Sequence, residues 1–292
     1  MGADEGATTS GTDPAVGSAG DSYAMGRSEA ETERLIRQSG LYAPFTRRLF
    51  ERAGLGPGMR VLDVGTGAGD VALIAAEMVG ASGAVVGVDR DPAVLETARA
   101  GRAALSNATF VEGDVEAPGL EGGFDAAVGR LVLMHQPNPA KTLGSVASMV
   151  RPGGVVAFQE YNCTTRSMLA FPPTPLWAEA LGWIAAALER AGVETEMGFK
   201  LRFKLRGTFA EAGLAEPKME LNAPVGGGPG WGGHEFAAET VRTLLPLLER
   251  FGIVSAEEVG IETLAERLRE EMVASGGVGK PPEMVSAWAQ KP

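Results

Sequence analysis

The segment that most constrains the fold of this chain is an apolar strand that runs directly into a glycine-rich turn. The strand Val61-Leu62-Asp63-Val64 is followed by the turn Gly65-Thr66-Gly67-Ala68-Gly69, and an apolar helical pattern begins at residue 71. Glycines let a ligand approach bare backbone, and the first turn of a helix offers unpaired N–H groups and the positive end of its dipole. The segment therefore predicts a ligand site at the carboxyl end of a parallel strand.

A dinucleotide-binding loop is the nearest generic interpretation of this turn, and one charge argues against it. The pattern G-x-G-x-x-G requires glycine at the sixth position, where this chain has Asp70. A carboxylate there would repel a pyrophosphate, so a nicotinamide-dependent oxidoreductase is disfavoured.

The composition narrows the classes of protein to which the chain can belong. It has 292 residues, 45% of them hydrophobic, and a formal net charge of -11, which argues against a nucleic-acid partner. One cysteine, Cys163, and two histidines leave no internal disulfide and no expected metal site. We find neither a signal peptide nor a run of about 18 apolar residues, so we expect a cytoplasmic protein without a membrane partner.

The pattern along the chain predicts four parts. Residues 1–20 are small and polar and predict a disordered tail, and residues 21–58 predict a helical amino-terminal cap. Residues 59–160 alternate between strand and helix patterns, which indicates a parallel sheet covered by helices. Residues 161–292 predict helical lid insertions and the remaining strands of the same catalytic domain.

Hydrophobic periodicity and turn residues place the individual elements. The expected strands are 60–64, 84–89, 109–111, 124–128, 154–158, 219–223 and 284–289. The expected helices are 28–36, 41–53, 71–77, 92–104, 176–191, 201–212, 234–251 and 256–274. Pro44 is expected to interrupt the start of the second helix, and the glycine-rich residues 226–233 predict a loop.

Three carboxylates follow successive expected strands. Asp63 belongs to the first strand, Asp89 ends the second and Asp114 follows the third. Because the carboxyl ends of parallel strands meet at one edge of a sheet, these side chains should converge on one crevice. An acidic residue after the second strand can also accept hydrogen bonds from ribose hydroxyls. A single aspartate at a strand end is as often a turn residue as a ligand-binding residue. Three aspartates at successive strand ends, together with the glycine turn, indicate a cofactor site.

Residues 59–160 resemble the core of the class I S-adenosylmethionine (SAM)-dependent methyltransferases. The matching motifs are Val61 to Gly69, Val86-Gly87-Val88-Asp89, Phe110 to Val115, Phe124 to Arg130 and Leu143 to Gly154, and residues 284–289 resemble the closing antiparallel strand. The resemblance implies an α/β fold with a Rossmann-like, seven-stranded, mostly parallel sheet, helices on both faces, and a helical amino-terminal cap with lid insertions. It also implies SAM as cofactor and S-adenosylhomocysteine (SAH) as product.

The resemblance assigns one group of residues to the methionine end of SAM. Gly65 and Gly67 would pack against the methionine portion. Asp63 would help to orient the turn and the cationic amino group. Arg130 lies where the fourth strand of the family faces the methionine end.

A second group is assigned by the resemblance to the nucleoside. Asp89 would hold the ribose hydroxyls and Arg90 would lie beside the adenine. Asp114 would accept from the adenine amino group, and the N–H of Val115 would donate to the ring.

Two residues near the expected strand ends are candidate bases. Methyl transfer from a sulfonium is an in-line displacement that needs alignment and dry surroundings, and a base only where the acceptor must lose a proton. His135 suits a hydroxyl acceptor, and Glu160 in an apolar pocket would suit a carbon acceptor. Each has a structural alternative: His135 as a helix-start residue before Pro137, and Glu160 as a hydrogen-bonding or cofactor-contacting residue.

Aromatic residues outside the sheet motifs are the candidate walls of an acceptor pocket. They are Phe171, Trp177, Trp183, Phe199 and Trp231. Tyr23 joins them because the segment 23–29 resembles a part that folds across the active site in small-molecule methyltransferases. Taken singly, each of the five is more often a core residue than a pocket residue. The basic residues between 200 and 206 predict either a solvated helix face or an anionic acceptor.

The sequence therefore predicts a SAM-dependent methyltransferase of the EC 2.1.1 class. We expect a largely apolar small-molecule acceptor and favour C- or O-methylation in specialised metabolism. The alternatives are a SAM-fold enzyme that catalyses a non-methylating reaction such as cyclisation, methylation of an anionic prenyl diphosphate, or a binding protein without turnover.

Overall fold

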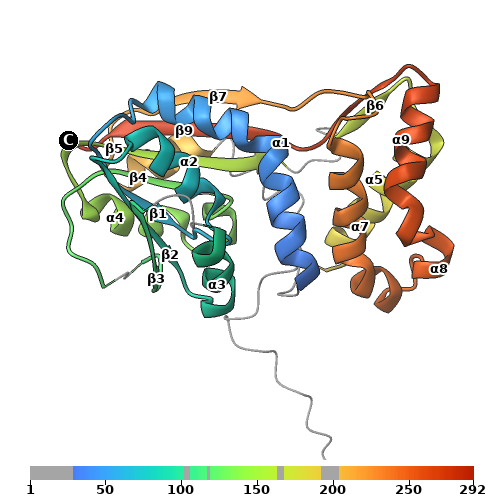
Figure 1. The fold of residues 1–292 in the computed structure, drawn as a ribbon, viewed down its shortest axis with the longest axis horizontal. Coiled ribbons are helices and arrows are strands. Elements are labelled where there is room, and N and C mark those ends of the chain that lie inside the picture. Colours follow the sequence, from blue (N-terminus) through green and yellow to red (C-terminus); the bar gives the residue numbers. More distant parts are fainter. Residues whose placement is uncertain (1–28, 102–105, 117–118, 163–167, 192–203) are drawn as a thin grey trace, which may run out of the picture.

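The computed structural model describes residues 29–101, 106–116, 119–162, 168–191 and 204–292, with side chains omitted for 29–38. The described residues form a sheet-containing part and a helical lobe, and the long helix α1 (Glu29–Ala53) runs between them (Figure 1). The carboxyl-terminal strands extend from the lobe back into the sheet (Figure 1).

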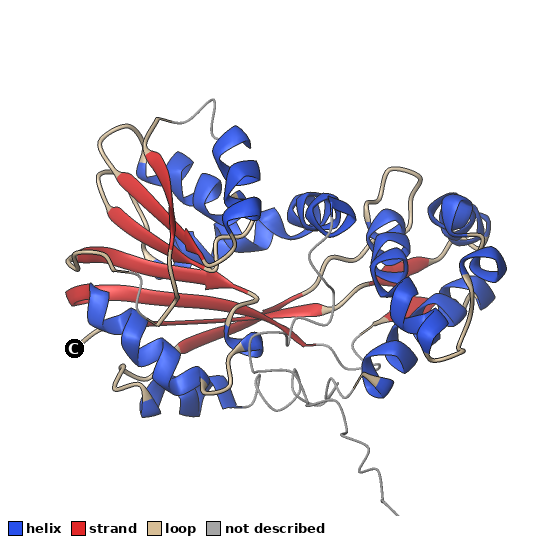
Figure 2. Ribbon diagram, turned by 90° about the horizontal axis from the view of Figure 1, so that it is seen from below, coloured by secondary structure: helices blue, strands red, loops and turns tan. Residues whose placement is uncertain are grey.

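The central sheet has seven strands. They are β1 (Arg60–Val64), β2 (Ala84–Asp89), β3 (Ala108–Glu112), β4 (Phe124–Arg130), β5 (Val150–Asn162), β7 (Lys218–Asn222) and β9 (Glu283–Gln290). Their order is β3-β2-β1-β4-β5-β9-β7, and β9 is antiparallel to both of its neighbours while the first five strands are parallel. Figure 2 shows the strong twist of this sheet. The predicted seven-stranded, mostly parallel sheet is confirmed.

Helices cover both faces of the sheet because successive strand residues point to opposite sides. On one face, α1, α2 (Asp70–Val79) and α3 (Pro92–Gly101) pack on alternate strand residues such as Val61. On the other face, α4 (Pro139–Met149) and the helical residues 204–211 pack on residues such as Leu62. The parallel strands are thus buried on both sides, as their near-continuous apolar sequences predict.

The amino-terminal helix differs from the prediction of two helices. α1 is one continuous helix with Pro44 inside it. Proline removes one helical hydrogen bond, but tertiary packing overrides this local effect. Tyr42 on one side of Pro44 is buried, and so is Phe50 on the other.

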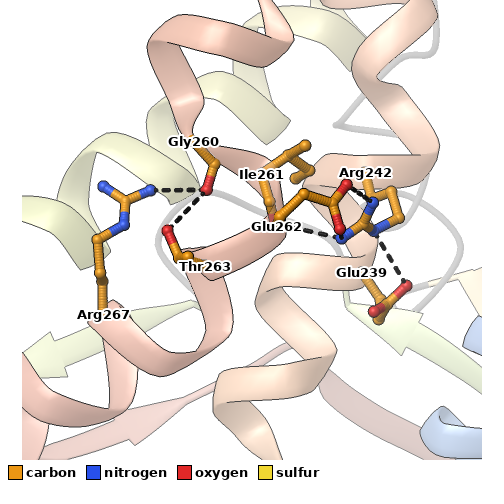
Figure 3. A network of polar contacts seen from close by, with 7 residues as sticks. All are labelled: Glu239, Arg242, Gly260, Ile261, Glu262, Thr263 and Arg267. Carbon is orange, nitrogen blue, oxygen red and sulfur yellow. Dashed lines mark hydrogen bonds and ion pairs between the residues drawn. The ribbon is translucent and has the colours of Figure 1, made fainter.

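The helical lobe contains α5 (Pro175–Arg190), α7 (Gly233–Arg250), α8 (Ala256–Val259), the 3₁₀ turn η3 (Ile261–Thr263) and α9 (Leu264–Ala274). The single helix expected over 256–274 is wrong, because the chain turns at Gly260 with φ of 60°. Arg267 Nη2 and Thr263 Oγ1 donate to the Gly260 carbonyl at 3.1 and 3.2 Å (Figure 3). Arg242 of α7 holds the same turn through the Ile261 carbonyl and Glu262 (Figure 3).

A second sheet, of two strands, lies beside the helices of the lobe and was not predicted from the sequence. It pairs β6 (Leu169–Phe171) with β8 (Val278–Lys280) in antiparallel register. Three-residue strands are too short to leave an alternating pattern in the sequence.

Among the helices that the structure describes, none has the length and apolar character needed to cross a bilayer. The same residues contain no group of three or more side chains that could bind a metal ion.

Candidate active site

The glycine turn follows β1 and approaches the loop after β4. Gly65 and Gly67 adopt φ values of 63° and 54°, in the left-handed region that favours glycine. A Cβ on Gly65 would lie 2.8 Å from Cγ2 of Val132, so the absence of a side chain lets the two segments pack together. A Cβ on Gly67 would meet nothing within 4 Å among the described residues, so this side of the turn is open to a ligand.

Asp63 is a buried carboxyl group directly before this turn. It is 1% exposed, and its Oδ2 accepts a 2.6 Å hydrogen bond from Thr66 Oγ1. Burial raises the pKa of Asp63 to about 7, although the Thr66 bond and the nearby Arg130 both act in the opposite direction. Its Oδ1 accepts no hydrogen bond of normal geometry within the described part of the chain, although the Ala72 N–H lies near enough to the carboxyl group to lower its pKa. An ammonium group would both satisfy this oxygen and favour the charged carboxylate.

Arg130 lies at the carboxyl end of β4 and forms an ion pair with Asp70. Its side chain is 5% exposed, and Nη1 donates to Thr46 Oγ1 of α1 at 3.1 Å. Burial lowers the pKa of Arg130, against the opposing influence of Tyr161, Asp63 and Tyr42. Asp70, expected from the sequence only to repel a pyrophosphate, is the ion-pair partner of Arg130.

Buried hydrogen bonds continue from Thr46 across the sheet. Thr46 Oγ1 donates to Gln159 Oε1 of β5 at 2.8 Å, and Gln159 Nε2 donates to Ser286 Oγ of β9 at 3.0 Å. All three side chains are buried. Sequence reasoning missed this chain of contacts, and its only signal is the presence of polar residues in apolar strand patterns.

Asp89 connects the glycine turn to the start of α3. Its Oδ2 accepts from the Gly67 N–H at 3.0 Å, and its Oδ1 accepts from the Asp91 N–H at 3.1 Å. A carboxylate has about four acceptor positions, so these bonds leave capacity for ribose hydroxyls. The residue is half-buried.

The remaining predicted nucleoside residues lie beside Asp89. β2 and β3 end together, since Asp89 pairs with Glu112 in the parallel register. Asp114 is exposed two residues beyond that pair, and its Oδ1 accepts from the Glu116 N–H at 2.7 Å. Arg90 is exposed, and Val115 is half-buried against the sheet core. The structure therefore brings the three predicted aspartates to one edge of the sheet.

The two candidate bases occupy contrasting environments. Glu160, near the end of β5, is buried, and burial raises its pKa to about 7 against three backbone hydrogen bonds. Oε1 accepts from the N–H groups of Val132 and Leu133 at 3.1 and 2.8 Å, and Oε2 accepts from Met134 at 3.3 Å. His135 ends the 3₁₀ turn η2 (Leu133–His135) and is exposed.

An apolar cluster lies at the carboxyl ends of β4 and β5, and we call it the aromatic cluster. Its buried members are Tyr42, Tyr161, Phe236 and Met284, and partly buried Leu41, Phe45, Leu131 and Met134 pack against it. The Tyr42 ring meets Tyr161 and Phe236 edge-on, with centroids 5.3 and 5.9 Å apart. Sequence reasoning missed this cluster because its members come from helices α1 and α7 as well as from strands β5 and β9.

The tryptophans predicted as acceptor walls lie in the helical lobe, outside the sheet core as predicted. Trp177 is 1% exposed within the lobe core, and half-buried Trp183 packs against the same core. Trp231 stacks on Trp177 with ring centroids 5.8 Å apart. Their burial favours a structural role, and contact with an acceptor stays a prediction.

Of the other predicted acceptor residues, Phe171 is the one that the structure describes. Phe171 is 69% exposed on β6. Tyr23, Phe199 and Cys163 lie outside the described residues. Of the basic residues between 200 and 206, Lys204 is exposed and Arg206 forms an exposed ion pair with Glu216.

Comparison with known proteins identifies the family. Residues 55–193 match the family described as a methyltransferase domain. The aklanonic acid methyltransferase DauC of Streptomyces sp. (strain C5) is 34% identical over 145 residues, covering 48% of this chain and 66% of that protein. The demethylmenaquinone methyltransferase of Staphylococcus aureus (strain MRSA252) is 30% identical over 120 residues, covering 41% and 50%. The chain thus spans between half and two thirds of these relatives' lengths.

A solved structure shares the fold over most of the chain. The phosphoethanolamine N-methyltransferase 2 of Haemonchus contortus, in complex with phosphomonomethylethanolamine and SAH, superposes with a TM-score of 0.56 at 16% identity, covering 95% of this chain and 61% of that one. The domain match, the strand order and the glycine turn with its aspartates agree, and the chain belongs to the class I SAM-dependent methyltransferases, whose cofactor is SAM.

Proposed function

We propose that this protein transfers a methyl group from SAM to carbon or oxygen of a largely apolar small molecule. The observation that carries the proposal is the meeting of two contrasting surfaces at one edge of the sheet. Asp63 and Arg130 form a buried charged surface, and Tyr42 and Tyr161 of the aromatic cluster lie close enough to Arg130 to influence its pKa. One surface suits the charged end of SAM, and the other suits an apolar acceptor.

The residues of the charged surface fit SAM. The unpartnered Oδ1 of Asp63 is an acceptor for the ammonium group, and the open side of Gly67 accommodates the methionine portion. Asp89 keeps acceptor positions for the ribose. SAM supplies a methyl group already activated as a sulfonium, so the protein's part is to bind, align and exclude water.

The aromatic cluster supports an apolar acceptor. Its buried rings pack edge-on against one another at the carboxyl ends of β4 and β5. The partly buried members Phe45, Leu131 and Met134 are the ones that an acceptor could contact. Two relatives carry names that refer to the small molecules aklanonic acid and demethylmenaquinone. These names support a small-molecule acceptor for this chain as well.

Of the two candidate bases, we favour His135 for a hydroxyl acceptor. Both oxygens of Glu160 already accept backbone N–H groups, and a proton taken up there would weaken those bonds. His135 is exposed at the end of the same turn, and histidine is the side chain that most often acts as a general base.

Two measurements test this function. The first incubates the protein with methyl-labelled SAM and a panel of phenols, reduced naphthoquinones and anthraquinone carboxylic acids, with phosphoethanolamine as the polar comparison. We expect label in apolar members of the panel. SAH binding without any labelled product would favour a non-methylating reaction such as cyclisation, and NADH binding without SAH binding would overturn the assignment.

The second measurement titrates SAH by calorimetry. Asp89→Ala should weaken binding at least about tenfold, because a hydrogen bond to a charged group contributes about 1.5–3 kcal/mol. Glu77→Ala is the matched control, since Glu77 is an exposed carboxylate paired with Arg47 on the outside of α2. It removes the same charge and should leave SAH binding unchanged.

A further inference from the structure

A buried carboxylate fixes the turn that joins the two halves of the site. We infer that Glu160 is a positioning residue, which holds residues 131–134 so that Val132 supports the glycine turn while Leu131 and Met134 close the aromatic cluster. The inference rests on the proposed function and adds a specific role within it. It differs from a role as base, because Glu160 here acts through the backbone it binds.

The turn has an unfavourable backbone that needs such support. Leu131 has φ of 59° and is the one non-glycine residue with positive φ in the part of the chain that the structure describes. A leucine rarely adopts this region, because its Cβ crowds the following carbonyl. Three consecutive N–H groups follow it, and the two oxygens of Glu160 accept all three. The carboxylate thus replaces the acceptors that a regular element would provide.

On the cofactor side, the fixed turn supports the glycine turn directly. The Val132 side chain occupies the space that a Cβ on Gly65 would need, with Cγ2 at 2.8 Å from that position. A displacement of Val132 would therefore remove the packing that holds Gly65 in its left-handed conformation. The affinity for the cofactor should depend on this contact.

On the acceptor side, the same turn supplies apolar surface. Leu131 and Met134 pack against the buried members of the aromatic cluster. Leu131 is further tied to β5, because its N–H donates to the Gln159 carbonyl at 2.8 Å. One carboxylate therefore sets the position of both surfaces relative to each other.

The test uses Glu160→Gln in the full chain. Glutamine keeps the size and one carbonyl oxygen, but it presents an amide NH₂ group where Met134 needs an acceptor. Amide hydrogen exchange of residues 131–135 and the SAH dissociation constant are measured for the variant and the wild type. We expect at least tenfold faster exchange in this segment and at least threefold weaker SAH binding.

Two further variants separate positioning from a general loss of structure. Glu283→Gln is the matched control, since Glu283 of β9 is a carboxylate that bonds the side chains of Asn162 and Lys280. It should leave exchange and SAH affinity at wild-type values. Val132→Ala keeps the bonds to Glu160, so it should weaken SAH binding without faster exchange at Leu133 and Met134.

The outcomes distinguish the alternatives. If Glu160→Gln kept both the amide exchange rates and the SAH affinity of the wild type, the inference would be overturned. If such a variant had also lost turnover, Glu160 would be identified as a base. Should Glu160→Gln fail to fold, unchanged SAH affinity in Val132→Ala would overturn it. A wild-type protein that binds no SAH would refute the proposed function, while the exchange comparison would still decide whether Glu160 holds the turn.

Discussion

Asp63 should make cofactor affinity depend on pH. Its pKa is raised to about 7 by burial, so at mildly acidic pH the free protein carries the neutral carboxylic acid. A bound ammonium group favours the carboxylate and lowers this pKa, so binding must release a proton below pH 7. The affinity for SAH should therefore fall as the pH is lowered.

The magnitude follows from the ionised fraction of Asp63. With a pKa of about 7 in the free protein and a carboxylate that stays ionised in the complex, the ionised fraction of free Asp63 is roughly 3% at pH 5.5 and half at pH 7.0. SAH should then bind about 16-fold more weakly at pH 5.5 than at pH 7.0, a difference of about 1.6 kcal/mol in binding free energy. The amino group of SAH stays mainly protonated in this range, because α-amino groups titrate near pH 7.7–8.0.

Calorimetry in two buffers of different ionisation enthalpy measures both the affinity and the proton release. We expect about 0.9 proton released per SAH at pH 6.0 in the wild type. Asp63→Asn should release none and show a flat profile, whereas Asp114→Asn, at an exposed carboxylate, should keep the wild-type slope. An affinity that varies less than about twofold in the wild type would refute the reasoning, as would the same slope in Asp63→Asn.

Three other predictions follow from burial and packing. Because burial raises the pKa of Asp63, its neutral acid stabilises the fold fully below about pH 4, and this stability is lost as the pH rises through 7. Asp63→Asn does not titrate. In urea titrations without ligand, its free energy of unfolding relative to wild type should therefore rise by about 3 kcal/mol from pH 5 to pH 8. Gly65→Ala should weaken SAH binding at least about tenfold through its contact with Val132. Gly153 also has a positive φ, but an added Cβ would have no neighbour closer than Arg151 Nη1 at 3.8 Å. Gly153→Ala should therefore destabilise the fold and leave SAH affinity unchanged. If both glycine variants weakened SAH binding equally, the assigned contact with Val132 would be contradicted. Trp177→Ala should cost about 3–5 kcal/mol of folding free energy with unchanged SAH affinity, whereas a stable variant with altered acceptor selectivity would place Trp177 in the pocket.

The elements of residues 59–160 could be predicted because their signals are local. The apolar strands, the glycine turn and the strand-end aspartates each lie within a few residues of the feature they define. β2, for example, has the predicted bounds Ala84–Asp89, and β1 has the predicted bounds Arg60–Val64. Parallel strand order then brings Asp63, Asp89 and Asp114 to one edge.

The rest of the site depends on contacts between distant residues, which leave no local pattern. Arg130 meets Asp70, and Glu160 meets the turn near Val132, only after the strands have assembled. The tryptophans were predicted as acceptor walls because they are aromatic and lie outside the sheet motifs, and this stays a prediction. The aromatic cluster could not be predicted, because tertiary packing brings Tyr42 of α1 to the strand ends. Gly260, by contrast, ends α8 as a left-handed glycine cap, a local signal that the predicted single helix overlooked, and Arg242 adds a contact from α7.

The attachment of α1 to the far end of the chain affects the order of folding during synthesis. The Tyr42 hydroxyl donates to the Pro282 carbonyl at 2.8 Å, between residues 240 positions apart, and β9 lies between β5 and β7. At translation rates of about 5–20 residues per second, the amino-terminal helix waits roughly 10–50 s for this neighbour to leave the ribosome. Leu49 and Phe50 can pack on β1 and α2 soon after those elements emerge, whereas the Tyr42 side of α1 lacks its carboxyl-terminal partner for the whole interval.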